Sequence, residues 1–254
     1  MKNMKDIEVN WCPHNGPNHI ERNHMDILAF EPEPLLKHVI SMRSKDTEYL
    51  KCPAFRDYCK NTFVMKSPID YSLEVVDDGE KKFLKSMHQD QKFFDEFVLS
   101  KFVEDRQKQK GPLNDTCTLF EFNFGTLVYS KESVIVEQIP SSFAKNTWHH
   151  NINLIPARFD ISKWIRPFVC AYEIFDDKIP IVIRRGDPLF YMRFVTERNV
   201  KLKRVNFNED LDYLMKNCLS RKDFESNSTM EENYEAAKPL INLKDNIFKT
   251  CPMK

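Results

Sequence analysis

The stretch PIVIRRGDPLFYMRFV, residues 180–195, carries the clearest fold signal in the chain. Two runs rich in β-branched and aromatic residues flank the polar segment Arg184–Asp187. Such runs favour strands, and Gly186 can adopt a positive φ at a tight corner. The pattern predicts two strands, residues 179–184 and 188–196, joined by a sharp turn.

Strand patterns continue on both sides of this hairpin. The segment CTLFEFNFGTLVYS, residues 117–130, alternates phenylalanine with polar or aliphatic residues and contains few helix formers. The turn signal DDGE predicts a hairpin between two further runs. Short turns between neighbouring runs are typical of antiparallel sheets, so we expect a mainly β fold with an antiparallel β-sandwich or jelly-roll-like core. The other runs expected to form strands are residues 61–67, 70–76, 81–87, 133–139, 167–175 and 199–206.

Three segments of different character predict the domain organisation. Residues 1–34 are polar and proline-containing, and we expect an irregular N-terminal segment with one short strand in DIEVNW. Residues 35–206 form the expected β-rich core domain. Residues 207–254 predict a helical C-terminal appendage that begins after Asn208 as N-cap, with apolar residues on one face. These apolar residues are Leu211, Leu214 and Met215.

Two helical patterns interrupt the predicted core. Pro53 suits the first turn of a short helix that ends near Cys59. Residues 89–105, QDQKFFDEFVLSKFVED, predict a helix followed by a strand, because the phenylalanines approximate helical spacing at first.

The composition argues against several classes of protein. Lys plus Arg equals Asp plus Glu at 38 each, so net charge gives no general attraction to nucleic acids or anionic membranes. The chain has only 5 glycines and neither a GxGxxG nor a GxxxxGK[ST] motif, which argues against the usual nucleotide-binding loops. We expect no signal peptide and no transmembrane segment, since no apolar run approaches about 18 residues.

The metal-ligating residue types lack the spacing of known sites. The 7 cysteines form no CxxC pair, and the sequence favours free thiols in a reducing compartment. His149 and His150 are adjacent, so on a strand they would point to opposite faces. The pair His88 and Asp90 resembles part of an iron-binding facial triad, but its charged surroundings favour a solvated helix. Three further histidines, His14, His19 and His24, are five residues apart, which suits neither one helix face nor one strand face. We therefore predict no metal site and no cofactor.

The turn between the two strands of the opening stretch is the candidate ligand site. No serine, cysteine or threonine stands in a recognisable nucleophile motif, so we predict no catalytic residue. Arginines can hold a phosphate or carboxylate, and a tyrosine can stack on a base. The candidate ligand-binding residues are Arg184, Arg185, Asp187, Tyr191 and Arg193. The interpretation that we favour is that the arginines face solvent beside the turn while Tyr191 and Phe194 lie on opposite strand faces, only one of which is core.

Two blocks of this sequence resemble an uncharacterised protein family of tailed bacteriophages, notably those that infect marine bacteria. The blocks are CPAFRDYCKNTFVMKSPID, Cys52–Asp70, and RGDPLFYMRF, Arg185–Phe194. The resemblance extends over most of residues 30–206 and implies a phage origin, but it implies no activity. The block IPIVIRRGDPLFYMRF is also similar to the β-hairpin ending of dUTPase-like chains, whose catalytic signatures this sequence lacks.

These observations favour a non-enzymatic phage protein, either a virion structural component or an accessory protein, that self-associates or binds other phage proteins in the virion or the host cytoplasm. The alternative is a small-molecule-binding or nucleotide-binding protein, or an enzyme, that acts on host metabolism or defence during infection. The sequence contains no recognisable nucleic-acid-binding motif.

Overall fold

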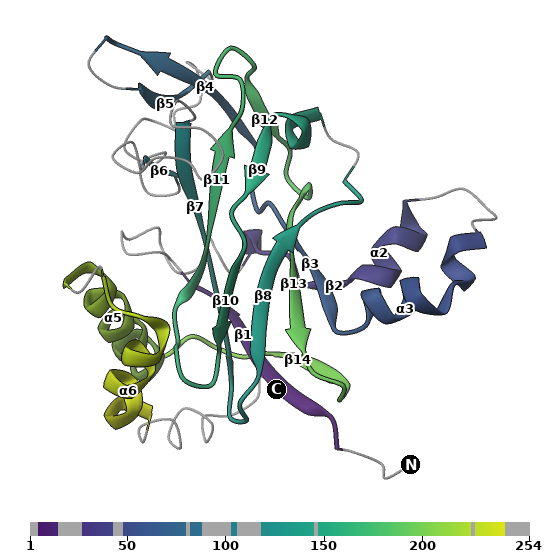
Figure 1. The fold of residues 1–254 in the computed structure, drawn as a ribbon, viewed down its shortest axis with the longest axis vertical. Helices are drawn as coiled ribbons and strands as arrows, with labels where there is room; N and C mark the ends of the chain where they lie inside the picture. Colours follow the sequence, from purple (N-terminus) through teal and green to yellow (C-terminus); the bar gives the residue numbers. More distant parts are fainter. Residues whose placement is uncertain are drawn as a thin grey trace.

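A computed structural model describes residues 5–14, 27–42, 48–79, 82–87, 103–105, 118–144, 147–224 and 227–241. The fold of these residues is mainly β, as the sequence predicts, with several antiparallel sheets and a few helices (Figure 1). The predicted helix within residues 89–102 lies outside the described residues.

Sheet A has the strand order β14-β1-β7-β11-β9, and β6 pairs with β7. All neighbouring strands are antiparallel except β1 and β14, which are parallel. The strands of sheet A are β1 (Ile7–Pro13), β6 (Val103–Asp105), β7 (Thr118–Ser130), β9 (Ile152–Leu154), β11 (Pro167–Ile174) and β14 (Val200–Arg204).

Two smaller sheets complete the β structure. Sheet B has the order β10-β8-β13-β3-β2, and sheet C has the order β12-β4-β5. The hairpin predicted around DDGE is confirmed as β4 and β5, and the strands predicted on either side of Arg184–Asp187 are confirmed as β12 and β13. These two strands do not form a hairpin with each other, because β12 pairs with β4 in sheet C and β13 pairs with β3 and β8 in sheet B. The strands of these sheets are β2 (Glu33–Pro34), β3 (Thr62–Lys66), β4 (Tyr71–Asp77), β5 (Lys82–Ser86), β8 (Ile135–Pro140), β10 (Ala157–Asp160), β12 (Ile181–Ile183) and β13 (Pro188–Val195).

The main apolar core contains side chains from all three sheets. Phe120, Phe122 and Tyr172 of sheet A form a cluster of aromatic rings with centroids 4.9–5.8 Å apart. Phe190 of sheet B and Leu73 of sheet C belong to the same core. Burial of such large apolar side chains is the dominant favourable contribution to folding.

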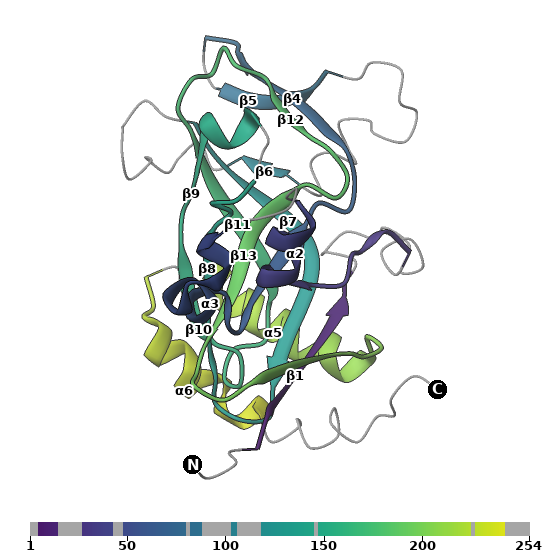
Figure 2. The same ribbon diagram turned by 90° about the vertical axis from the view of Figure 1, so that its right-hand side faces the viewer.

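Helices cover sheet B on the side away from this core. α2 (Leu35–Ser41) and α3 (Pro53–Cys59) pack with Val64 and Tyr191 in a second apolar cluster (Figures 1 and 2). Tyr191 and Phe194 do lie on opposite faces of β13, but both are buried. The expectation that one face of this strand meets solvent is therefore wrong, because distant helices cover that face.

Two C-terminal helices pack against sheet A. The Asn208 side chain accepts a hydrogen bond from Leu211 N at 2.9 Å, which confirms the predicted N-cap of α5 (Glu209–Phe224). The predicted apolar face of α5 packs on Cys12, Leu127 and Tyr129. α6 (Met230–Ile241) contacts α5, and its partly buried Tyr234 packs against the main core. Two 3₁₀ turns, η1 (Glu48–Lys51) and η2 (Thr147–His150), complete the described elements.

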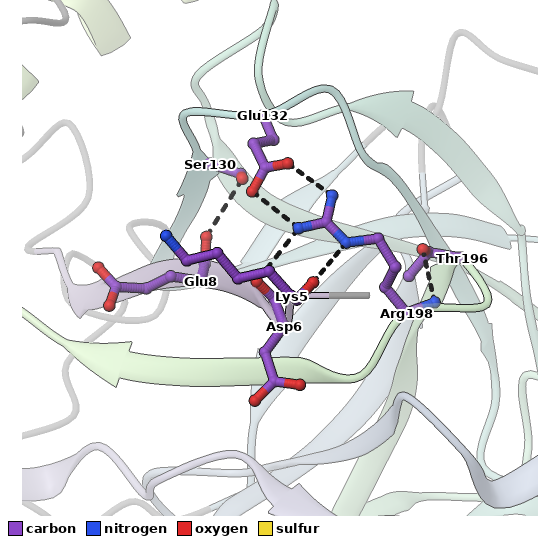
Figure 3. Close-up of polar contacts among 7 residues, drawn as sticks. All are labelled: Lys5, Asp6, Glu8, Ser130, Glu132, Thr196 and Arg198. Carbon is purple, nitrogen blue, oxygen red and sulfur yellow. Dashed lines mark hydrogen bonds and ion pairs between the residues drawn. The ribbon is translucent and has the colours of Figure 1, made fainter. Parts of the chain in front are cut away.

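The N-terminal strand β1 lies inside sheet A, between β14 and β7. Arg198 fixes its start: the guanidinium donates to the Lys5 carbonyl at 2.7 Å and the Asp6 carbonyl at 3.2 Å while it pairs with Glu132 (Figure 3). The predicted boundary at residue 34 therefore does not mark the edge of the core, because tertiary pairing brings residues 7–13 into it.

Candidate functional site at the Arg184–Asp187 turn

The Arg184–Asp187 turn closes on itself through Asp187. Asp187 Oδ2 accepts a hydrogen bond from Arg184 N at 2.8 Å, and Asp187 N donates to the Arg184 carbonyl at 2.9 Å. Gly186 lies between them at φ +90°, a conformation that L side chains rarely adopt. Asp187 thus shapes the turn through contacts to the backbone.

The segment Ser67–Asp70 holds the turn from the other side. Gly186 N donates to the Ser67 carbonyl at 2.8 Å, and Ser67 N donates to the Asp187 carbonyl at 2.9 Å. Arg185 N donates to Asp70 Oδ1 at 2.7 Å. Four successive backbone N–H groups, from Arg184 to Asp187, thus have acceptors within the protein, so they do not form an open cradle for a phosphate.

The two arginines of the turn have different surroundings, although both are exposed. The Arg185 guanidinium lies 4.3 Å from the centroid of the Phe30 ring, and its Nη2 is 3.4 Å from the Leu28 carbonyl. No hydrogen bond or ring contact joins the Arg184 side chain to the part of the chain that the structure describes. Arg185 thus contacts the segment before β2, and Arg184 remains available to solvent.

The other two candidate residues lie along β13 and contact other parts of the fold. Tyr191 is fully buried, and its hydroxyl accepts a hydrogen bond from Phe143 N at 2.9 Å. Burial raises the pKa of Tyr191 to about 12. Arg193 donates to Glu137 on the neighbouring strand and lies 6.0 Å from the Tyr58 ring. The structure thus brings Arg184, Arg185 and Asp187 together and places Tyr191 and Arg193 in separate packing roles.

A narrow apolar pocket lies next to the turn. Its wall combines residues of sheets A and B with two residues that precede β2. Phe30 belongs both to this wall and to the contact with Arg185. The lining residues are Ala29, Phe30, Met65, Lys66, Pro68, Thr126, Phe168, Leu189 and Phe190.

A charged network adjoins the pocket at Lys66. Glu33 Oε2 lies 2.7 Å from Lys66 Nζ and 3.2 Å from His38 Nδ1. Burial raises the pKa of the Glu33 carboxyl, but the hydrogen bond and charge of Lys66 outweigh it, so the pKa is lowered. Burial also lowers the pKa of His38. A neutral His38 that donates from Nδ1 to Glu33 leaves Nε2 as a buried acceptor, for which the described residues provide no hydrogen-bond partner.

Ser141 and His149 form a second polar contact near the turn. Ser141 Oγ lies 3.3 Å from His149 Nδ1 and 3.4 Å from Nε2, and the hydroxyl donates to the Leu189 carbonyl at 3.1 Å. An activated serine would instead donate to one ring nitrogen. The imidazole stacks on Trp148 at 3.8 Å, and burial lowers the pKa of His149 to about 4. This arrangement suits packing of a neutral imidazole.

The other histidines and cysteines do not gather with acidic residues. Within the described ranges no three or more His, Cys, Asp or Glu residues are grouped for a metal ion. His149 and His150 lie on the turn η2, while His19, His24 and the His88–Asp90 motif lie outside the described residues. No disulfide bond joins any two of the described cysteines, which are Cys12, Cys52, Cys59, Cys170 and Cys218. No helix among the described residues is long and apolar enough to span a membrane.

Sequence reasoning missed the residues that join the turn to its surroundings. Phe30, Lys66 and His149 are far from residues 184–193 in the chain, and no local pattern links them to the turn. One signal was present: the SPID end of the block Cys52–Asp70 contacts the start of the block Arg185–Phe194.

Comparisons of this chain with protein-family models, curated proteins and solved structures found no match.

Proposed function

We propose that this chain is a non-enzymatic phage protein, a virion structural or accessory component, that acts by associating with itself or with other phage proteins. Its scaffold would be an antiparallel β-sandwich or jelly-roll-like core, located in the virion or the host cytoplasm. The observation that carries the proposal is a group of exposed apolar side chains on and beside sheet C. This sheet C face consists of Met87, Phe175, Ile179 and Val182.

The sheet C face is built by pairing and by a fixed turn. Val182 on β12 is the register partner of Ser72 on β4, and Ser72 Oγ lies 3.5 Å from the Met87 sulfur. The turn before β12 is held by Asn151, whose amide donates to the Asp176 carbonyl at 2.9 Å and the Ile179 carbonyl at 3.2 Å. Exposed apolar side chains that form a contiguous patch are typical of protein contact sites, and we propose that these four side chains form one.

A second copy of the chain is the partner that we propose for this face. The formal net charge of the chain is zero, so two copies have no net electrostatic repulsion to overcome. The arginines of the block Arg185–Phe194 also support a structural role. Arg185 contacts Phe30, and Arg193 pairs with Glu137, both in the same chain.

Light scattering with a matched pair of variants tests this function. Val182 and Val195 are both exposed valines, at 36% and 44%, but only Val182 belongs to the sheet C face. We expect the wild-type chain and Val195→Lys to form an oligomer, and Val182→Lys to shift the mass toward the monomer. A monomeric wild-type chain that is also absent from purified phage particles by mass spectrometry would contradict the proposal.

The pocket beside the Arg184–Asp187 turn favours a second function: a protein or enzyme that binds a small molecule or nucleotide and acts on host metabolism or defence. A thermal-shift screen with nucleotides, 2-oxoglutarate and divalent metals tests it. A rise in melting temperature with one of these ligands would support this function, and no shift with any of them would count against it.

A further inference from the structure

The pocket between sheets A and B is closed by the segment Ile27–Glu31, called here the strap. Phe30 and Ala29 of the strap form part of the pocket wall, opposite Phe168 of sheet A and Phe190 of sheet B. The free interior is about 10 Å³, room for roughly one water molecule. A larger ligand therefore fits only if side chains of the wall move, and Phe30 belongs to a segment of the wall outside the sheets.

The strap is held over the pocket by weak contacts at its outer surface. Arg185 stacks on Phe30 and lies 3.4 Å from the Leu28 carbonyl, which is long for a hydrogen bond. Ile27 is 76% exposed. At the other end of the strap, Glu33 is fixed by pairing of β2 with β3. Among the described residues, loss of the contacts of Arg185 would leave the strap held by its junction with β2 and by the packing of Ala29 and Phe30 in the pocket wall.

The residues beneath the strap determine which ligand chemistry fits. Met65, Phe168, Leu189 and Phe190 are almost completely buried and present an apolar wall with two aromatic rings. Lys66 is the one charged side chain among the lining residues, and it is partly exposed. Its ammonium already pairs with Glu33 at 2.7 Å, so a ligand carboxylate would have to share it with Glu33. Aromatic walls favour a flat ring, and an ammonium group at the opening favours an anion.

We propose that the strap is a lid latched by Arg185, and that the pocket beneath it binds a small aromatic carboxylate. The ring would replace Phe30 against Phe168 and Phe190, and the carboxylate would lie near Lys66. Arg185 would thus control entry to the pocket. This inference deepens the second function above, because it assigns that function a pocket and a ligand class.

Oxidation of Met65 by hydrogen peroxide reports whether the lid is open. The full-length chain is treated with peroxide, and the oxidation rate of each methionine is measured by peptide mass spectrometry. Met65 lines the pocket, while Met87 on the surface and fully buried Met192 provide internal controls. The variants are Arg185→Ala and its matched control Arg184→Ala, which alters the same turn without a described contact to the strap.

We expect Arg185→Ala to raise the oxidation rate of Met65 about two- to fivefold, the factor that corresponds to loss of a surface cation–π contact. Arg184→Ala should leave the rate at the wild-type value, and neither variant should change the rate of Met192. An unchanged rate in Arg185→Ala would overturn the latch. A faster rate for Met192 would also overturn it, because general loosening would then explain the result.

Phenylacetate and its neutral analogue phenylacetamide test the ligand class. In Arg185→Ala, millimolar phenylacetate should slow the oxidation of Met65 and leave that of Met87 unchanged, and phenylacetamide should protect less. Equal protection by both compounds, or protection by neither, would overturn the assignment of an aromatic carboxylate. The thermal-shift screen uses other ligands and the wild-type chain, so failure of the second function and failure of the latch are distinguished.

Discussion

Arg193 and Glu137 are register partners on the adjacent strands β13 and β8, and both Nε and Nη2 of the guanidinium donate to Glu137 Oε2, at 3.0 and 2.6 Å. The other carboxylate oxygen lies 3.7 Å from Arg158 on β10. One acidic side chain thus joins two arginines across three strands of sheet B. Because the Glu137 side chain is only 18% exposed, removal of its main partner, Arg193, should lower the free energy of unfolding.

A double-mutant cycle with Arg193→Ala and Glu137→Ala should give a coupling free energy of about 1 kcal/mol, more than a typical surface pair. Urea denaturation of the four proteins measures it. The exposed helical pair Lys216 and Asp212 is the control, with an expected coupling of about 0.3–0.5 kcal/mol. Equal couplings for the two pairs would contradict the role assigned to Arg193.

Asn61→Ala should destabilise the fold by about 2–4 kcal/mol. The Asn61 amide donates to the carbonyls of Thr196 and Arg198, and its oxygen accepts from Val200 N. Its backbone also has φ of 54°, a left-handed conformation. Asn61→Gly loses the same hydrogen bonds without the steric cost, so it should be more stable than Asn61→Ala by about 1 kcal/mol. Thermal unfolding measures both, and equal losses would show that backbone conformation adds nothing.

Stability should fall as the pH drops from about 7 toward 4. Burial lowers the pKa of His14 and of His149 from 6.5 to about 4, so between these values the unfolded chain binds more protons than the folded chain. Each histidine should lower the free energy of unfolding by about 2 kcal/mol when the pH falls from 7.5 to 5.

Urea denaturation at these two pH values tests the prediction with His14→Gln and His149→Gln. Each variant should lose less stability on acidification than the wild type. The matched control His150→Gln replaces an exposed imidazole and should keep the wild-type dependence. A wild-type dependence in all three variants would rule out the two buried histidines as its source.

Arg198→Ala should release the start of β1 without unfolding the protein. Arg198 donates hydrogen bonds to two carbonyls of the N-terminal segment and to the Glu132 carboxylate (Figure 3). Hydrogen exchange should become several-fold faster at Ile7 N, which donates to the Asn199 carbonyl at 2.8 Å.

The control for this prediction is Lys201→Ala, which removes a more exposed ion pair with Asp6. Its exchange at Ile7 should stay close to the wild-type rate. If Lys201→Ala and Arg198→Ala accelerate exchange equally, the hydrogen bonds of the guanidinium to the backbone are not what fixes β1.

The sequence predicts local structure well where neighbouring residues determine it. The alternation of residue types predicts β12 and β13, and a glycine predicts the turn at Gly186. Asn208 caps its helix by accepting a hydrogen bond from an N–H only three positions away. Whether the candidate site residues are accessible to a ligand depends instead on residues that are far away in the sequence. Tyr191 looks available beside the arginines in the sequence, but α2 and α3 bury it.

The sequence by itself determined the β-rich class, the β4–β5 hairpin and the C-terminal helices, because hydrophobic period, turn chemistry and capping act over a few residues. Only the tertiary structure decided that β1 enters sheet A, that Arg193 pairs with Glu137, and that Phe30 covers a pocket beside Arg185. Those contacts join residues from 56 positions apart, as in the Arg193–Glu137 pair, to 193 positions apart, as in the pairing of Ile7 with Val200. Which residues become partners depends on how the three sheets pack, and no local sequence pattern predicts that packing.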